Sequence, residues 1–184
     1  IMDLVVKPIV KGAKEEGIKF RGVLYPVIMI VEEDGERIPK VLEINVRDCD
    51  PGAEAKLPRL ESDIVDLSIA VIEGKLNEVE VRFSNNYAVA VCAVSGFLVG
   101  REGIKPGYPA DHYTNQPITG IEYVKDAIIY ANGIVKTNGF ETTGGRVLTL
   151  TALGKTLEEA RSKAYREIEK INFPGMRYRK TIGW

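Results

Sequence analysis

Polar and apolar residues alternate in residues 41–47, and the polar ones are Glu43, Asn45 and Arg47. On a β-strand, alternate residues share one face and lie ~6.5 to 7 Å apart. A carboxylate and an amide oxygen at this spacing can converge on one hard cation such as Mg²⁺ or Mn²⁺. An arginine two residues further along suits a phosphate or carboxylate held by that cation. The segment therefore predicts one wall of a metal-triphosphate site.

The same three residues have an ordinary alternative explanation. Glu, Asn and Arg are common on the solvated face of an antiparallel strand, and the alternation alone favours that explanation. The pattern by itself leaves both readings open.

A second candidate site lies in residues 142–146, where two threonines and two glycines precede Arg146. Gly144 and Gly145 can expose successive backbone N–H groups as an anion-binding nest, and the arginine adds a charged donor, which suits a phosphate. The alternative is a glycine turn that leads into a strand over residues 146–152. The residues alone do not decide between them.

The elements around these candidates predict an α+β fold. Strands over 22–32 and 40–47 flank a turn and form a hairpin. A helix precedes the hairpin, and Pro8 either kinks this helix or delays its start. A second helix, capped by Ser62 or Asp63, follows the hairpin. Residues 48–61 and 96–117 are predicted as loops. Further strands are expected at 79–83, 87–94, 119–123, 127–130, 134–136 and 146–152, before a last helix with a capping box at Thr156 and Glu159.

Composition excludes several classes of protein. With 25 Lys and Arg against 26 Asp and Glu, the net charge of −1 gives no electrostatic reason to expect nucleic acid or an anionic membrane as partner. The apolar runs are far shorter than the ~20 residues of a membrane-spanning helix. Two cysteines, Cys49 and Cys92, and one histidine, His112, form no disulfide or zinc pattern, so a reduced, cytoplasmic setting is expected. His112 is expected on the surface.

The segment with Glu43, Asn45 and Arg47, followed by Asp50 and Pro51, resembles the metal-binding strand and loop of phosphoribosylamine–glycine ligases, which are ATP-grasp enzymes. The resemblance extends along nearly the whole chain, through residues 22–25, 57–63, 74–76, 144–148, 151–154 and 176–180. The Glu-x-Asn element is shared by many ATP-grasp enzymes, whereas its combination with residues 144–148 is specific to this ligase.

The resemblance implies that residues 1–77 are the C-terminal part of an ATP-grasp domain. Residues 78–184 would be a small β-rich domain, similar to a rudiment single hybrid motif, that completes the active site. Because the chain begins at Ile1 in an apolar-periodic segment without a cap, an N-terminal portion of the same polypeptide is expected as its partner, and the chain alone is expected to be inactive.

The implied reaction joins glycine to phosphoribosylamine through a glycyl phosphate, with ATP converted to ADP and phosphate, in purine synthesis. Glu43 and Asn45 would hold the metal ions, and Arg47 would stabilise the transferred phosphoryl group or the glycine carboxylate. Asp50 would hold the glycine ammonium, Gly145 and Arg146 would bind the sugar phosphate, and Leu42 would contact either the nucleotide or the core.

Two segments depart from the family pattern. A small insertion after Arg47 leaves open whether Glu54 replaces the family's glutamate, and residues 96–117 are longer than usual, with no role assigned. The alternatives are another ATP-grasp ligase or carboxylase with a different acceptor, and a binding module that kept the fold without the activity.

Overall fold

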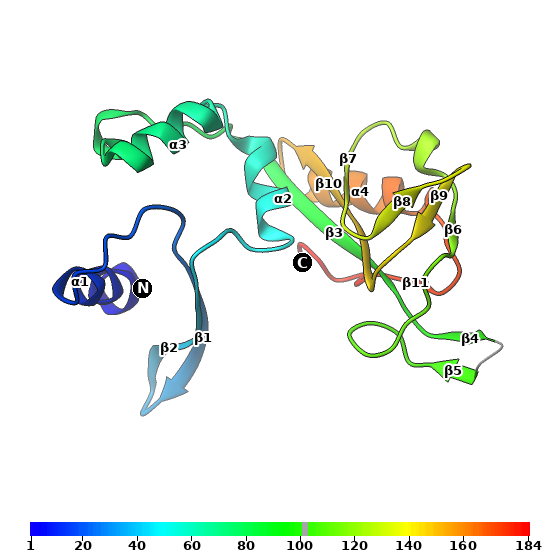
Figure 1. The fold of residues 1–184 in the computed structure, drawn as a ribbon, viewed down its shortest axis with the longest axis horizontal. Helices are drawn as coiled ribbons and strands as arrows, with labels where there is room; N and C mark the ends of the chain where they lie inside the picture. The colour runs from blue at the N-terminus through cyan, green and yellow to red at the C-terminus, as the bar shows by residue number, and fades with distance from the viewer. Residues whose placement is uncertain (101–102) are drawn as a thin grey trace. The chain divides into compact units, whose positions relative to one another are not determined.

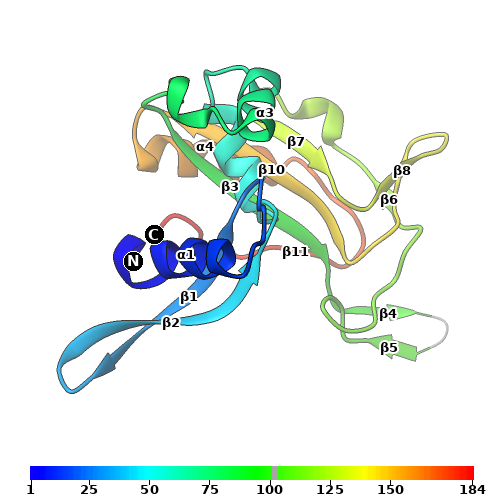
Figure 2. The ribbon, with the colours of Figure 1, turned by 60° about the vertical axis from the view of Figure 1, so that its left-hand side comes forward.

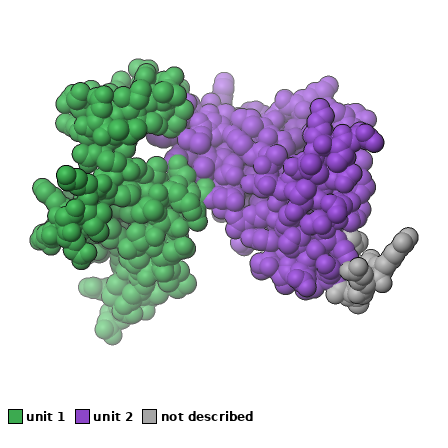
Figure 3. All heavy atoms as spheres, in the orientation of Figure 1, with its two compact units in different colours: residues 1–49, 61–82 green, residues 50–60, 83–184 purple. Residues whose placement is uncertain are grey.

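The structure is a computed structural model that describes residues 1–100 and 103–184. The chain divides into two compact units, coloured separately in Figure 3. Unit 1 comprises Ile1–Cys49 and Glu61–Arg82, and unit 2 comprises Asp50–Leu60 and Phe83–Trp184. The domain boundary expected between residues 77 and 78 stays a prediction about independently folding domains.

Unit 1 begins with a π-helical turn over Met2–Val6, followed by α1 at Lys7–Glu15. Pro8 lies in the first turn of α1, where its fixed φ suits the start of a helix. The late helix start predicted at Pro8 is confirmed. No described helix is long and apolar enough to cross a membrane.

The predicted hairpin of unit 1 is confirmed. Strands β1 (Tyr25–Glu33) and β2 (Glu36–Asn45) are antiparallel and joined through Asp34 and Gly35, which both have positive φ, as a tight hairpin turn requires. Figure 2 shows this long twisted ribbon. The prediction that β2 reaches Arg47 is wrong: the strand ends at Asn45, so Arg47 lies two residues beyond it.

Helix α3, Ile64–Glu73, follows its predicted signals. The Asp63 carboxylate accepts hydrogen bonds from the backbone N–H groups of Val65 and Asp66. Gly74 ends the helix in the left-handed conformation, with φ of 76°.

Two predictions about the connecting segments are wrong. Residues 48–61 contain a short helix, α2 (Gly52–Lys56), and a 3₁₀ turn at Leu57–Arg59 instead of loop alone. The strand expected over 79–83 is absent, and only one isolated bridge joins Phe83 to Leu60. Alternating apolar residues predicted a strand there, but in the described part of the chain its end is bonded to residues 59–62, which do not form a strand and so give no ladder.

Unit 2 is built on a four-stranded antiparallel sheet in the order β11-β3-β10-β7. These strands are β3 (Tyr87–Ser95), β7 (Ile128–Ala131), β10 (Arg146–Gly154) and β11 (Met176–Arg177). Helix α4, Leu157–Ile168, packs along β3 and β10, as Figure 1 shows. The core lies between this helix and the sheet and includes Val91, Leu150, Ala164 and Phe173.

Smaller sheets lie at one end of unit 2. Strands β6 (Pro117–Ile118), β8 (Ile134–Lys136) and β9 (Phe140–Thr142) form one, and β4 (Leu98–Gly100) with β5 (Gly103–Lys105) forms another. The expectation of loop throughout 96–117 is therefore wrong. The strand expected over 119–123 is also wrong, because Ile121–Tyr123 is a 3₁₀ turn that Gly120 starts with φ of 86°.

Helix α4 carries one buried acid, Glu167, whose side chain is 1% exposed. Its carboxylate accepts hydrogen bonds from Lys170 Nζ at 2.7 Å and from the Lys125 backbone N–H at 2.9 Å. Burial by itself would raise the pKa of this carboxyl group, but these hydrogen bonds outweigh burial and lower its pKa to about 2. Glu167 thereby ties the turn at residue 125 to α4.

We expect Glu167→Gln to lower the unfolding free energy at neutral pH by on the order of 2 to 3 kcal/mol. Because the folded-state pKa is depressed, this contribution is present above the ordinary pKa of 4.5 and is lost as the pH falls towards 2. Chemical denaturation across this pH window measures it. In Glu158→Gln, the control, only an exposed pair with Arg161 is lost. Equal acid sensitivity of wild type and Glu167→Gln would contradict this account.

Candidate active-site residues in the two units

Glu43 and Asn45 lie on β2 of unit 1, opposite Val27 and Tyr25 of β1. Glu43 is exposed, and no hydrogen bond or ion pair engages its carboxylate among residues 1–100 and 103–184. Asn45 is half-buried. Both side chains offer uncommitted hard oxygen atoms, the donor type that Mg²⁺ and Mn²⁺ prefer. Across the described residues no group of three or more His, Cys, Asp and Glu side chains could hold a metal ion.

Tyr25 and Cys49 lie beside this pair. A hydrogen bond to Cys49, with smaller contributions from burial and from the charge of Glu43, raises the pKa of Tyr25 above its usual value. The Tyr25 hydroxyl therefore stays protonated at neutral pH.

Arg47 and Leu42 occupy different settings from those expected. Arg47 lies beyond the end of β2, and its Nη1 donates to the carbonyl oxygen of the next residue, Asp48, at 2.9 Å. Leu42 is 59% exposed, so it is not part of a core in this unit. The catalytic role of Arg47 and the nucleotide role of Leu42 stay predictions.

In unit 2 the structure brings Asp50 and Arg146 together from positions 96 residues apart. Arg146 Nη1 donates to the Asp50 carboxylate at 2.7 Å, and Arg146 Nε donates to the Tyr108 hydroxyl at 2.8 Å. The hydrogen bond to Asp50, and after it that to Tyr108, raises the pKa of Arg146, so the guanidinium stays charged. The side chains of Arg146 and Asp50 are 41% and 42% exposed, which leaves them accessible to a ligand.

The local fold explains why Arg146 points outward. Arg146 opens β10 opposite Val94, and the register shifts before Leu148, which pairs with Ala93. This β-bulge turns Val147 and Leu148 both into the core while Arg146 stays exposed. A bulge of this kind re-aims side chains at the edge of a site.

The glycine pair before Arg146 leaves backbone donors open. Within the described part of the chain, the N–H groups of Gly144 and Gly145 donate no hydrogen bond to any acceptor. The Gly145 carbonyl oxygen is engaged and accepts from the Ser95 N–H at 2.8 Å. These two N–H groups adjoin Arg146 in the sequence, but neither glycine has positive φ, and Gly145 is buried against Tyr108 and His112, so the conformation is not that of an αR–αL nest.

The loop between β5 and β6 supplies the other side of this cluster. A Cβ added at Gly145 would lie 2.4 Å from Tyr108 Cδ2 and 3.0 Å from His112 Cε1, so both rings lie directly on this glycine. Ser95 anchors the loop, because its carbonyl oxygen accepts from the Tyr108 N–H at 2.7 Å and its hydroxyl donates to the Tyr113 carbonyl at 2.9 Å. His112 is half-buried here, rather than a free surface residue as expected.

Glu54, on α2, lies over the face of the sheet opposite α4. Its charge adds to burial in raising the pKa of both Cys92 and Tyr130. One oxygen of its carboxylate is buried and has no hydrogen-bond partner among the residues described. Cys92 is consequently a protonated, unreactive thiol at neutral pH. Glu54, which is close to Asp50 in the sequence, has a carboxylate oxygen that can accept a hydrogen bond.

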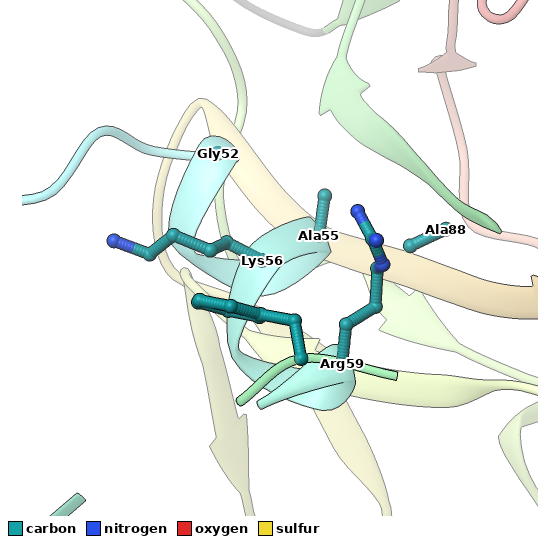
Figure 4. A pocket seen from close by; sticks show the side chains of 6 residues that line it. Gly52, Ala55, Lys56, Arg59 and Ala88 are labelled. Carbon is teal, nitrogen blue, oxygen red and sulfur yellow. The ribbon is translucent and has the colours of Figure 1, made fainter. Parts of the chain in front are cut away.

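A separate pocket of 410 Å³ lies alongside α2 and is lined by Gly52, Ala55, Lys56, Arg59, Phe83 and Ala88. In Figure 4 the Lys56 and Arg59 side chains leave the backbone in different directions, with the Arg59 guanidinium between Ala55 and Ala88. Arg59 Nη2 donates to the Ser84 carbonyl at 3.1 Å. None of the site residues predicted from the sequence lines this pocket.

Sequence reasoning missed Tyr108 and His112. Both lie in the segment of 96–117 to which no role was assigned, and nothing in local spacing links them to a glycine more than thirty residues away. The available signal was the concentration of aromatic, glycine and proline residues at 107–113, which is unusual for a solvated loop.

Comparisons with known proteins identify the family and the fold of the chain. The model of the phosphoribosylglycinamide synthetase ATP-grasp (A) domain matches residues 1–53, and that of the C domain matches residues 104–184. A biotin carboxylase domain of a thermophilic 2-oxoglutarate carboxylase shares the fold, with a TM-score of 0.52 and 17% identity over 94% of this chain and 36% of that one. The fold is therefore that of the ATP-grasp class.

Closer relatives narrow the class. Phosphoribosylamine–glycine ligase of Archaeoglobus fulgidus is 72% identical over all 184 residues, which cover 38% of its own length. The structure of phosphoribosylamine–glycine ligase from Thermotoga maritima has a TM-score of 0.73 and 31% identity over 98% of this chain and 43% of that one. The chain belongs to the phosphoribosylamine–glycine ligase family and spans about two fifths of the length of these relatives.

We expect Gly145→Ala to displace the Tyr108 ring and to lower the unfolding free energy by about 1 to 3 kcal/mol through overpacking. Gly144→Ala is the matched control, because the nearest atom to its added Cβ lies at 3.7 Å, an ordinary van der Waals distance. Denaturant titrations of both variants measure the difference. Equal unfolding free energies for the two would show that Tyr108 does not pack on Gly145.

Proposed function

We propose that a larger protein containing this chain is an ATP-dependent ligase that joins glycine to phosphoribosylamine, giving glycinamide ribonucleotide, ADP and phosphate in purine synthesis. Family membership supports the activity. The observation in the structure that carries it furthest is the cluster around Arg146, where a guanidinium held by Asp50 and Tyr108 adjoins two backbone N–H groups that have no acceptor among the described residues. Such a cluster suits the phosphate of a sugar phosphate.

Metal binding is assigned to residues of unit 1. Glu43 and Asn45 would hold Mg²⁺ or Mn²⁺, which neutralises charge on the ATP phosphates when bound. The glycine carboxylate and the γ-phosphate are both negatively charged and repel each other. Positive groups must therefore neutralise this charge before the carboxylate can attack. Arg47, exposed just past the end of β2, would exchange its hydrogen bond to the Asp48 carbonyl for one to the transferred phosphoryl group or the glycine carboxylate.

Binding of phosphoribosylamine and of the glycine ammonium is assigned to residues of unit 2. Gly145 and Arg146 would bind the phosphate of phosphoribosylamine, and Asp50 would hold the glycine ammonium. The structure adds a second task for Asp50, since its carboxylate already holds Arg146 Nη1. A half-exposed ion pair contributes at most about 1 kcal/mol to stability, so its value here is in orienting the two side chains.

The remaining assignments concern the whole protein. Residues 1–77 would complete an ATP-grasp domain whose other part lies in the N-terminal portion of the larger polypeptide, and residues 78–184 would close the site. The setting is cytoplasmic, without nucleic acid or membrane as partner. The short coverage of the relatives supports a longer polypeptide.

The test is an ADP-release assay on the larger protein with Mg²⁺. We expect ADP only when glycine and phosphoribosylamine are both present, and no ADP when bicarbonate replaces glycine, because the acceptor and acyl substrates must both be held. Residues 1–184 alone are the control and should release none.

Bicarbonate-dependent ADP release without glycine would identify a carboxylase instead. ATP binding without turnover under any of these conditions would identify a binding module.

A further inference from the structure

The hydrogen bonds of Arg146 divide its guanidinium between two partners. Asp50 takes Nη1, and the Tyr108 hydroxyl takes Nε. Within the described residues, Nη2 donates no hydrogen bond, although it carries two N–H groups. Nη2 is therefore the nitrogen atom of the guanidinium that can donate to a ligand.

A carboxylate beside an arginine ordinarily forms two parallel hydrogen bonds with adjacent nitrogen atoms of the fork. Here the Asp50 carboxylate reaches Nη1 through one oxygen, Oδ2. Because the Tyr108 hydroxyl occupies Nε, Asp50 cannot close on the edge formed by Nε and Nη2. The hydrogen bonds from Nε to Tyr108 and from Nη1 to Asp50 hold the guanidinium plane from two sides, and Nη2 has no acceptor among the described residues.

Several contacts hold Tyr108 in place. Its ring lies against Gly145, its backbone N–H is bonded to Ser95, and the Arg146 guanidinium carbon lies 5.5 Å from the ring centroid. Ser95 is buried and also holds the Gly145 carbonyl, so one residue of β3 connects the loop to the glycine pair. These contacts fix the ring, and with it the hydroxyl, beside Gly145 and Arg146.

We propose that Tyr108 is a positioning residue of the acceptor site: by holding Arg146 Nε, its hydroxyl directs Nη2 towards the phosphate of the sugar-phosphate substrate, beside the N–H groups of Gly144 and Gly145. The proposal rests on the function proposed above and assigns a role to the otherwise unassigned segment 96–117.

The test uses Tyr108→Phe in the complete ligase, because phenylalanine keeps the ring on Gly145 and removes only the hydroxyl. We expect the KM for phosphoribosylamine to rise about tenfold, the cost of losing one hydrogen bond to a charged group, with kcat and the KM values for ATP and glycine unchanged. Competitive inhibition by inorganic phosphate should weaken in parallel. Tyr165→Phe is the matched control, since its hydroxyl bonds only Arg179 and Ile182 of the C-terminal segment.

A double-mutant cycle separates positioning through Arg146 from a general structural effect. Arg146→Ala alone should raise the KM for phosphoribosylamine, and adding Tyr108→Phe to it should raise that KM no further. If the two changes multiply, or if kcat and the KM for ATP change as much as the KM for phosphoribosylamine, the positioning role is overturned. An unchanged KM in Tyr108→Phe overturns it as well.

The two proposals fail in different ways. Wild-type enzyme that does not use phosphoribosylamine refutes the function itself, and an unchanged KM in Arg146→Ala refutes the phosphate site on unit 2. A raised KM in Arg146→Ala together with a wild-type KM in Tyr108→Phe refutes only the inference about Tyr108.

Discussion

The orientation of one guanidinium group organises the site in unit 2. Arg146 lies at the start of β10, where a bulge turns the two following side chains into the core and leaves the arginine outside. Asp50 and Tyr108, from segments far apart in the chain, then hold it from two sides. Segment 50–60, the loop before β6 and the glycine turn before β10 must all be in place for this arrangement, so the local geometry depends on the fold of the whole unit.

The sheet and α4 supply the rigid support. Leu148, Leu150, Ala160 and Ala164 are fully buried between the two layers, and close packing of this kind fixes β10 relative to β3. Glu167 adds a buried, charge-assisted link from α4 to the turn at residue 125. A site assembled on the end of such a strand keeps its donors in position before a ligand arrives.

Much of this could be predicted where the signal is local. The Asp63 cap, the Asp34–Gly35 turn, the Thr156 cap of α4 and the strands β3 and β10 follow from residues within a few positions of one another. The reciprocal bond of the predicted capping box is different, because the Glu159 carboxylate accepts from the Lys155 N–H. Resemblance to a family, rather than pattern, decided between a metal site and a solvated face at Glu43 and Asn45. The pairing of Arg146 with Asp50 and Tyr108 could not be predicted, because it depends on tertiary contacts between segments with no shared periodicity. The strand expected at 79–83 failed for the same reason, since a ladder needs a partner that the alternation cannot reveal.

The central claim is that Arg146, with the glycine pair beside it, binds the phosphate of the acceptor. A crystal structure of the complete ligase with glycinamide ribonucleotide tests it most directly. The account predicts the ribose phosphate within about 3 Å of Arg146 Nη2 and of the Gly144 and Gly145 nitrogen atoms, with the Tyr108 hydroxyl still on Nε. A phosphate bound elsewhere, with both carboxylate oxygens of Asp50 bonded to Arg146 Nη1 and Nη2, would contradict it.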